Sequence, residues 1–278
     1  MLNAVNKSLI AAIVVMAGAL GACSDKEQEG AEALYGAAET QIGAAQYQQA
    51  LATLDTLNAR YPEQTGVRRQ ALRLRALAMQ GLALDSISAG SEALAAATIE
   101  RESRDPKFRH VDSNVGLEGY FLPKGVSEKV MTSTCIQPRV SDKGFFYIVA
   151  NVQGKSIGLR SIEFVDGAET ASSSPLSPAR VIKVEGSESA SFNPEDLEGI
   201  GEWLLSHPGA SKVIIRGSKS NASVKLDAKL RSQLVDCYEY SRALQNQRLA
   251  RLKREKYERM LATARDQLAN LPQPEDKQ

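Results

Sequence analysis

The run LDAKLRSQLVDCYEYSRALQNQRLARLKREKYERMLATARDQLANL, residues 226–271, decides the fold of this chain. It contains neither Gly nor Pro, and its apolar and small residues recur at intervals of mostly three and four, which is typical of one helix face. We therefore expect one helix over 226–271 and a disordered tail over 272–278. A helix of this length outgrows a compact domain, so it must pack on other helices, join a coiled coil or project. The shared face consists of Leu226, Leu230, Leu234, Tyr238, Ser241, Leu244, Leu249, Leu252, Met260, Ala264, Leu268 and Leu271.

Charge on the final helix is opposite in sign to charge near the start of the chain. Residues 242–259 carry seven basic and two acidic side chains, whereas residues 24–64 carry two basic and seven acidic ones. The opposite signs favour an antiparallel bundle in which the final helix packs back on the N-terminal helices. Alternatively, both faces are simply solvated, because a surface ion pair contributes only about 0–1 kcal/mol. A further interpretation is an interaction stripe for lipid phosphates or an acidic partner, made of Arg248, Arg251, Lys253, Arg254, Lys256 and Arg259.

A strand-rich domain is predicted over 106–225, where Gly, Ser, Val, Ile and aromatic residues increase and the apolar runs shorten. Asn193 before Pro194 is a good helix cap, so one short helix that ends near His207 interrupts the strands. At 145–152 apolar residues fall on both faces, which indicates a strand covered on both sides. With helices before and after it, this antiparallel sheet or small sandwich makes the fold class α+β. The candidate strands are 119–122, 129–139, 145–152, 159–165, 180–185, 189–192 and 212–216.

Residues 31–105 are predicted to be helical. Two helices fill 31–59, Pro62 stops the second of them, and two more follow at 65–83 and 85–99. The second helix resembles the latter half of a tetratricopeptide repeat, a resemblance that rests on Tyr47, Ala50, Leu51, Leu54, Leu57, Tyr61 and Pro62. No second copy follows at the spacing of about 34 residues, and stable arrays need about three units. We therefore expect a short helical hairpin or bundle, with an Ala-rich helical spacer as the alternative.

The N-terminus carries a secretory signal. Lys7 precedes an apolar run at 9–20, and the run ends in Leu20-Gly21-Ala22-Cys23, which resembles the lipobox of bacterial lipoproteins. The resemblance implies that residues 1–22 are removed and that Cys23 is acylated, because the lipobox cysteine is the lipid-bearing residue.

A lipid-anchored tether is predicted at 23–30, because this stretch is polar and charged. No Asp directly follows Cys23, so the usual inner-membrane retention signal is missing. The acidic, Ser-led stretch resembles the export signals of Bacteroidetes surface lipoproteins. We expect an outer-membrane location and leave open whether the protein faces the periplasm or the cell surface.

The charge composition of the chain limits the classes of partner that it is expected to bind. Residues 1–22 contain a single charged side chain, Lys7, so the mature chain carries 33 basic and 33 acidic residues and is formally neutral. Such a chain gives no argument for binding nucleic acid. An exported chain meets an oxidising compartment that allows a disulfide between Cys135 and Cys237, but two separately buried thiols are favoured, because nothing places the two cysteines together.

Motifs for catalysis are sparse. His110 and His207 are the only histidines, no cysteine or histidine cluster has metal spacing, and no Gly-x-Ser-x-Gly elbow is present. We therefore expect no catalytic residue, no metal and no cofactor. A sugar-stacking platform competes with plain core packing as the role of five aromatic residues, and core packing is favoured. These are Tyr120, Phe121, Phe145, Phe146 and Trp203.

The layout resembles uncharacterised Bacteroidetes lipoproteins with a repeat-like helical start, a strand-rich middle and a coiled-coil end. The strand-rich part of that resemblance lies at Gln137-Pro138-Arg139-Val140 and the following Gly144-Phe-Phe-Tyr-Ile-Val. The hypothesis is a lipid-anchored outer-membrane scaffold that binds a protein partner. The alternatives are a glycan-binding lipoprotein of a nutrient-uptake system, an accessory factor in outer-membrane assembly, and a hydrolase with a cleft around His110 or His207.

Overall fold

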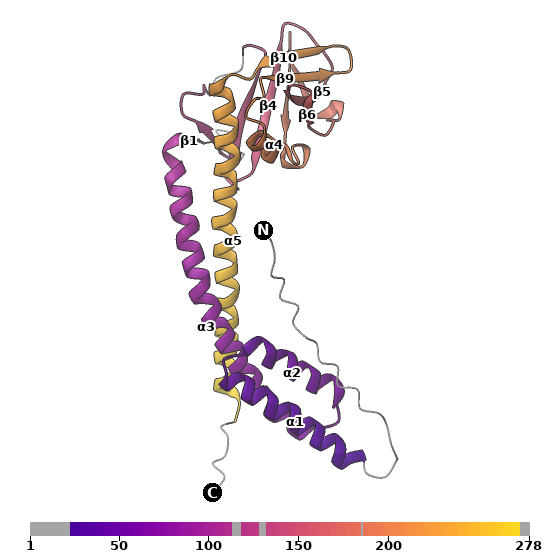
Figure 1. Cartoon of the computed structure of the whole chain (residues 1–278), viewed down its shortest axis with the longest axis vertical. Coiled ribbons are helices and arrows are strands. Elements are labelled where there is room, and N and C mark those ends of the chain that lie inside the picture. The colour runs from indigo at the N-terminus through magenta and orange to yellow at the C-terminus, as the bar shows by residue number, and fades with distance from the viewer. Residues whose placement is uncertain (1–22, 113–117, 128–131, 185, 273–278) are drawn as a thin grey trace. The chain divides into compact units, whose positions relative to one another are not determined.

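A computed structural model describes residues 23–112, 118–127, 132–184 and 186–272, and its helices and strands give an α+β fold (Figure 1). The signal peptide predicted at 1–22 and most of the tail predicted at 272–278 lie outside the described residues. The chain forms two compact units, one made of the described residues up to Ser86 and from Tyr257 onward, the other of 87–256. None of the described helices combines the length and apolar character needed to cross a bilayer.

The first unit is helical. Helix α1 spans Cys23–Gly43, α2 spans Tyr47–Arg60, and α3 spans Thr65–Arg104 and so continues into the second unit. Two predictions are wrong here. The stretch predicted as a flexible tether is the first turns of α1, and the helices predicted at 65–83 and 85–99 are one helix. Residue 84 is a leucine, and neither Gly nor Pro interrupts the helical periodicity there, so nothing local ends the helix.

Small residues let the helices of the first unit approach closely. A Cβ on Gly81 of α3 would overlap the ring of Tyr47, the first residue of α2, and a Cβ on Gly30 would overlap the Tyr61 ring. The last turns of α5 (Ala228–Asn270) belong to this same unit, so the final helix packs with the N-terminal helices as predicted, although the basic stretch 242–256 lies in the other unit. The buried centre of the unit consists of Ala38, Leu54, Leu57, Ala71 and Leu74.

The second unit contains two antiparallel sheets. One has six strands in the order β1-β2-β3-β4-β8-β7, and the other has four in the order β10-β9-β5-β6. The strands are β1 (Phe108–Val111), β2 (Tyr120–Pro123), β3 (Cys135–Ser141), β4 (Phe146–Gln153), β5 (Leu159–Asp166), β6 (Glu169–Ser172), β7 (Val181–Val184), β8 (Ser187–Phe192), β9 (Lys212–Gly217) and β10 (Asn221–Lys225).

Every predicted strand has a counterpart, and three strands were missed. The strand predicted at 129–139 begins at Cys135, and residues 128–131 lie outside the described part of the chain. The missed strands β1, β6 and β10 are short, and β6 and β10 are polar strands at sheet edges, so they lack the apolar run that marks a buried strand. Strand β4 is buried on both faces, as its sequence indicates.

The predicted inserted helix is broken in two. Asn193 caps a 3-10 turn, Pro194–Asp196, and α4 then spans Ile200–Ser206. Gly199 between them has a φ of 74°, a left-handed conformation that ends one helical piece before the next begins.

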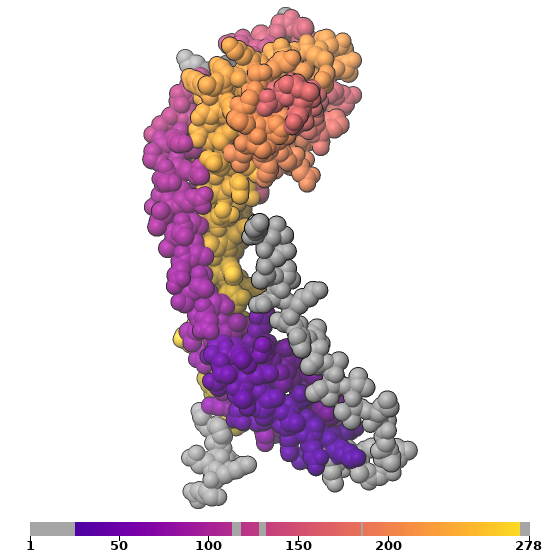
Figure 2. All heavy atoms as spheres, in the orientation of Figure 1, coloured from indigo at the N-terminus to yellow at the C-terminus, as the bar shows by residue number. Residues whose placement is uncertain are grey.

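Helix α5 (Ala228–Asn270) packs on the six-stranded sheet through Tyr240, whose ring stacks on Phe108 at 4.3 Å between centroids. The Ser241 hydroxyl accepts from the Phe146 N–H at 3.1 Å and donates to the Gly144 carbonyl at 2.7 Å, so it fixes the turn before β4 to the helix. Within this unit α3 lies beside α5 (Figures 1 and 2), joined by the Arg104–Glu239 ion pair at 2.6 Å.

Candidate functional site

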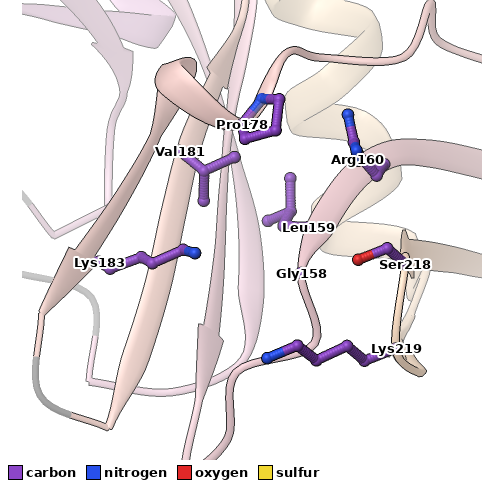
Figure 3. Close-up of a pocket in the computed structure, with 8 residues that line it drawn as sticks. All are labelled: Gly158, Leu159, Arg160, Pro178, Val181, Lys183, Ser218 and Lys219. Atoms are coloured by element: carbon purple, nitrogen blue, oxygen red, sulfur yellow. The ribbon is translucent and has the colours of Figure 1, made fainter.

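The candidate site is a pocket of about 200 Å³ between β7, the start of β5 and the β9–β10 turn (Figure 3). Because β7 belongs to the six-stranded sheet and β5 to the four-stranded one, the pocket lies where the edge of one sheet meets the other. Its lining residues are Gly158, Leu159, Arg160, Pro178, Val181, Lys183, Ser218 and Lys219.

The pocket is basic. Three of its lining side chains are cationic, Arg160, Lys183 and Lys219, and none is acidic. Figure 3 shows the Lys183 side chain reaching into the pocket from β7 and the Lys219 side chain reaching in from the β9–β10 turn, with Gly158 and Leu159 on the strand opposite Lys183. Arg160 donates to the Leu176 carbonyl at 3.1 Å. Among the described residues, none of the three cations lies within 4.0 Å of a carboxylate oxygen, and Lys183 faces Glu188 across the β7–β8 ladder.

A buried carboxylate organises the pocket floor. Glu188 of β8 has an exposed fraction of 0 %, and its Oε2 accepts from the N–H groups of Ile157, Gly158 and Leu159 at 3.1, 2.9 and 3.0 Å. Its Oε1 accepts from the Ser156 hydroxyl. Three successive N–H groups that converge on one anion form a backbone nest. The nest is filled by the chain's own carboxylate, so its N–H groups are not free to bind a ligand in the pocket above it.

Two opposing effects act on the pKa of the Glu188 carboxyl group. Burial raises the pKa, but the Ser156 hydroxyl and the three backbone N–H groups lower it by more, so the pKa of Glu188 lies below its ordinary value. Glu188 is therefore ionised at neutral pH and holds the 156–159 loop in place.

Backbone geometry shapes the same loop. Gly158 has a φ of 70°, and a Cβ there would overlap the Ser218 hydroxyl. The Ser218 N–H donates to the Gly158 carbonyl at 2.8 Å, and the Lys219 N–H donates to the Ile157 carbonyl at 2.9 Å. The β9–β10 turn is thus fixed to the loop before β5, which sets the position of the Lys219 side chain.

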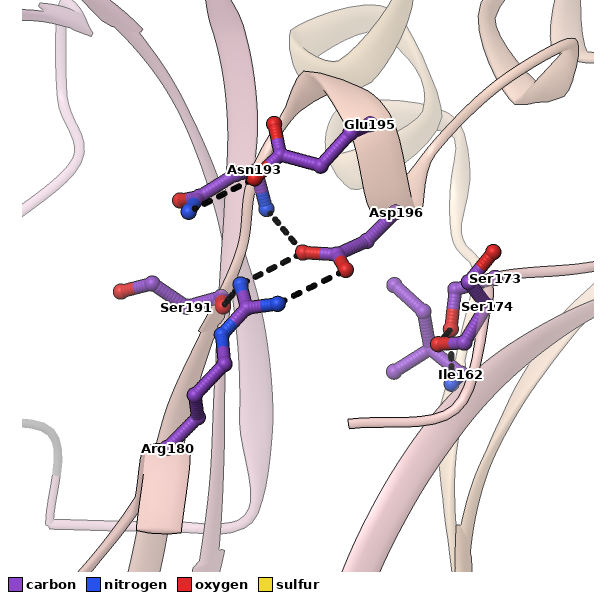
Figure 4. Close-up of polar contacts among 8 residues, drawn as sticks. All are labelled: Ile162, Ser173, Ser174, Arg180, Ser191, Asn193, Glu195 and Asp196. Atoms are coloured by element: carbon purple, nitrogen blue, oxygen red, sulfur yellow. Dashed lines mark hydrogen bonds and ion pairs between the residues drawn. The ribbon is translucent and has the colours of Figure 1, made fainter. Parts of the chain in front are cut away.

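An arginine clamp positions β7 (Figure 4). Arg180, directly before β7, makes a bidentate pair with Asp196 at 2.8 and 2.6 Å and also donates to the Ser191 carbonyl of β8 at 3.1 Å. The Asp196 carboxylate accepts from the Asn193 N–H at 2.8 Å as well. Although burial raises the pKa of Asp196, Arg180 and the Asn193 N–H lower it below its ordinary value. The clamp fixes the beginning of β7 to the turn that follows β8.

Strand β7 is an open sheet edge. Among the described strands it ends the six-stranded order and pairs with β8 alone. Val181 and Lys183 line the pocket, whereas the alternating residues Ile182 and Val184 are 66 % and 65 % exposed. The other three described edges differ, because β1 begins and ends in buried residues and β6 and β10 are polar. An apolar, exposed edge is an interaction surface or an aggregation hazard.

The contacts of His207 favour a structural role over activation of Ser206. Its Nδ1 lies 2.9 Å from both the Ser206 hydroxyl and the Trp203 carbonyl, and Nε2 lies 2.6 Å from Glu169. A carbonyl only accepts, so Nδ1 carries the hydrogen and cannot take the Ser206 proton. The Glu169 carboxylate, together with the Trp203 carbonyl, raises the pKa of His207. His110 lies between two carboxylates, Asp142 at 2.6 Å and Asp112 at 3.0 Å, which makes a surface charge cluster.

The five aromatic residues do not form one exposed row. The Phe146 ring is buried in the core, Phe121 packs against Tyr240, and Trp203 stacks on His207 at 4.2 Å. Phe145 is 39 % exposed. The remaining ring, Tyr120, lies beneath the Arg139 guanidinium at 4.3 Å.

The other predicted site residues are separate from the pocket. Arg254 is half-buried beside α3, where a Cβ on Gly90 would lie 3.6 Å from the Arg254 Cβ. Cys135 and Cys237 are free thiols, one half-buried and one buried, so the disulfide is not formed. Cys23 is the first residue of α1. The rest of the stripe is exposed on α5: Arg248, Arg251, Lys253, Lys256 and Arg259.

Sequence reasoning did not find the pocket. Arg160, Lys183 and Lys219 are far apart in the chain, and no short motif joins them. One local signal was present, since Lys183 is a charged residue in the otherwise apolar run of β7. Among the described residues, no group of three or more His, Cys, Asp or Glu side chains could hold a metal ion. Comparison with protein families, curated proteins and solved structures finds no match to this chain.

Proposed function

We propose that this protein is a lipid-anchored scaffold of the outer membrane that binds a protein partner by strand addition at β7. The observation that carries the proposal is the open β7 edge, on which Ile182 and Val184 are exposed. A strand added to such an edge gains main-chain hydrogen bonds, and its side chains gain the pockets beside the edge.

The free energy of burying apolar side chains favours a partner strand paired with β7. Ile182 and Val184 are each about two-thirds exposed, and covering them contributes about 1–2 kcal/mol per side chain. The Arg180 clamp holds the beginning of β7 in strand geometry, so little ordering of β7 is needed when a partner strand pairs with it.

Photocrosslinking in intact cells tests the docking edge. A benzophenone amino acid at Ile182 or Val184 is expected to give one discrete adduct, because a paired partner strand lies within reach of both side chains. The same probe at Thr170, on the polar edge strand β6, is the matched control and should give no such adduct.

The partner protein recovered in the adduct must then be purified, and its binding to this chain must be measured directly. We expect it to bind the wild-type chain and to lose affinity about tenfold for the double variant Ile182→Lys and Val184→Lys, which keeps the fold because both side chains are exposed. Equal adducts at Thr170, or equal binding by the double variant, would exclude β7 as the docking edge.

The proposed lipid anchor at Cys23 is tested in a separate experiment. Cys23→Ser removes the thiol that the lipobox resemblance assigns to acylation, so metabolic labelling with a fatty acid should fall to background and the protein should leave the membrane fraction. Ser24→Ala is the matched control and should label normally. A Cys23→Ser protein that stays labelled and membrane-bound would contradict the anchor.

A further inference from the structure

We infer that the strand added to β7 is an acidic extended peptide segment, one carboxylate of which enters the pocket formed by Arg160, Lys183, Lys219 and Ser218. The inference rests on the proposed docking at β7 and names the chemistry of the partner. It combines two adjacent observations, an open strand edge and a basic pocket that share the residue Lys183.

Strand geometry brings a partner side chain to the pocket. Side chains alternate along a strand, so Val181 and Lys183 face the pocket while Ile182 and Val184 face the other side. An added strand lies about 4.8 Å from β7, and its residue opposite Lys183 has its Cβ about 5 Å away on the same face. An Asp or Glu at that position reaches the pocket without any change in β7.

Charge selects a carboxylate for this position. The pocket holds three cations and no acidic lining residue, and the nest beneath it is already filled by Glu188. A carboxylate between Lys183 and Lys219 relieves the repulsion of their like charges, and the Ser218 hydroxyl supplies a neutral donor. Such charge-assisted hydrogen bonds are about twice as strong as neutral ones.

Lys183 also disfavours pairing of β7 with strands that lack an acidic residue. A charged residue on an edge strand, such as the exposed Lys183, resists pairing with an apolar strand, because the pairing would cover its charge without supplying an opposite one. A second copy of this chain is disfavoured too, since β7 has the sequence VIKV and would bring another lysine and no acid. A free anion would leave Ile182 and Val184 uncovered, whereas an acidic peptide covers them and fills the pocket.

The test is selection of peptides on the full mature chain in detergent. A displayed library of random ten-residue peptides is selected on the wild type and, in parallel, on the double variant Lys183→Gln and Lys219→Gln. We expect wild-type selections to be enriched in Asp or Glu flanked by alternating β-branched residues, and this enrichment to vanish on the double variant. The matched control, Lys212→Gln with Lys225→Gln, removes the same charge from the facing pair on β9 and β10 and should select like the wild type.

Affinity measurements follow with the best selected peptide and with its Glu→Gln (or Asp→Asn) form. Each single change, in the peptide or in the pocket, is expected to weaken binding at least tenfold, and combining them should add little, because both remove one interaction. Thermal unfolding of each variant, unchanged from the wild type, shows that the fold is intact.

The outcomes separate the two proposals. Peptides that bind without acidic preference, and are lost on the Ile182→Lys and Val184→Lys variant, overturn the carboxylate inference while docking at β7 stands. No enriched peptide, or binding that survives both double variants, overturns both. Inorganic phosphate provides the last arm: if phosphate binds through Lys183 and Lys219 while no acidic peptide is selected, the pocket is a free-anion site and the peptide assignment is wrong.

Discussion

Replacing Glu188 by Ala is expected to lower the free energy of unfolding of the strand-rich unit by about 3–5 kcal/mol. The reason is that the change leaves three buried backbone N–H groups and the Ser156 hydroxyl without their acceptor. Urea unfolding followed by circular dichroism measures the loss. Glu198→Ala, at an exposed position beside α4, is the matched control and should change stability by less than about 0.5 kcal/mol.

The Glu188 effect should depend on pH. Because the folded-state pKa of Glu188 lies below its ordinary value of 4.5, the carboxylate stabilises the fold fully above that pH, and the contribution disappears as pH falls through the folded pKa. The stability difference between wild type and Glu188→Gln should therefore be largest near neutral pH and shrink in acid below about pH 4.5. An equal difference at pH 7 and pH 3 would contradict the assigned ionisation.

Replacing Tyr240 by Ala is expected to cost about 3–5 kcal/mol, because it leaves a cavity between α5 and the six-stranded sheet. The ring is buried, stacks on Phe108 at 4.3 Å and meets the edge of Phe121 at 5.4 Å. Tyr240→Phe keeps the ring and loses only the hydrogen bond from the hydroxyl to Asp105 at 2.8 Å, so it should cost about 1 kcal/mol.

The pair of Tyr240 variants separates packing from hydrogen bonding. Chemical denaturation of both, with Leu252→Ala at an exposed position of α5 as the control, gives the comparison. A Phe variant as unstable as the Ala variant would mean that the hydroxyl, rather than the ring, fixes α5 to the sheet. An Ala variant as stable as the wild type would mean that α5 is not anchored through this residue.

Local patterns predicted the elements that bury a continuous apolar face. The helix predicted at 226–271 is α5, within two residues at each end, because its periodicity is uninterrupted. The short edge strands β6 and β10 were missed because they exist through pairing with β5 and β9 rather than through their own composition. The continuity of α3 was missed for a related reason, since a helix boundary predicted without Gly or Pro rests on periodicity alone.

The candidate site could not be predicted from the sequence, because it is made by long-range placement. Lys183 and Lys219 become neighbours only when the two sheets meet, and Glu188 reaches the 156–159 loop across about 30 residues of chain. The lipid anchor is the opposite case, since its signal is contiguous at Leu20-Gly21-Ala22-Cys23. It stays a prediction, because residues 1–22 lie outside the described structure.

Cys237 gives the strand-rich unit a native reporter of its own opening. Its thiol is fully buried on α5 among core residues, and burial raises its pKa well above the ordinary value of 9.0. Thiols react as thiolates, so alkylating reagents and oxidants reach this sulfur only when the helix lifts from the sheet. The rate at which Cys237 is modified, measured separately from that of the half-buried Cys135, therefore reports how often this opening occurs, without an added label.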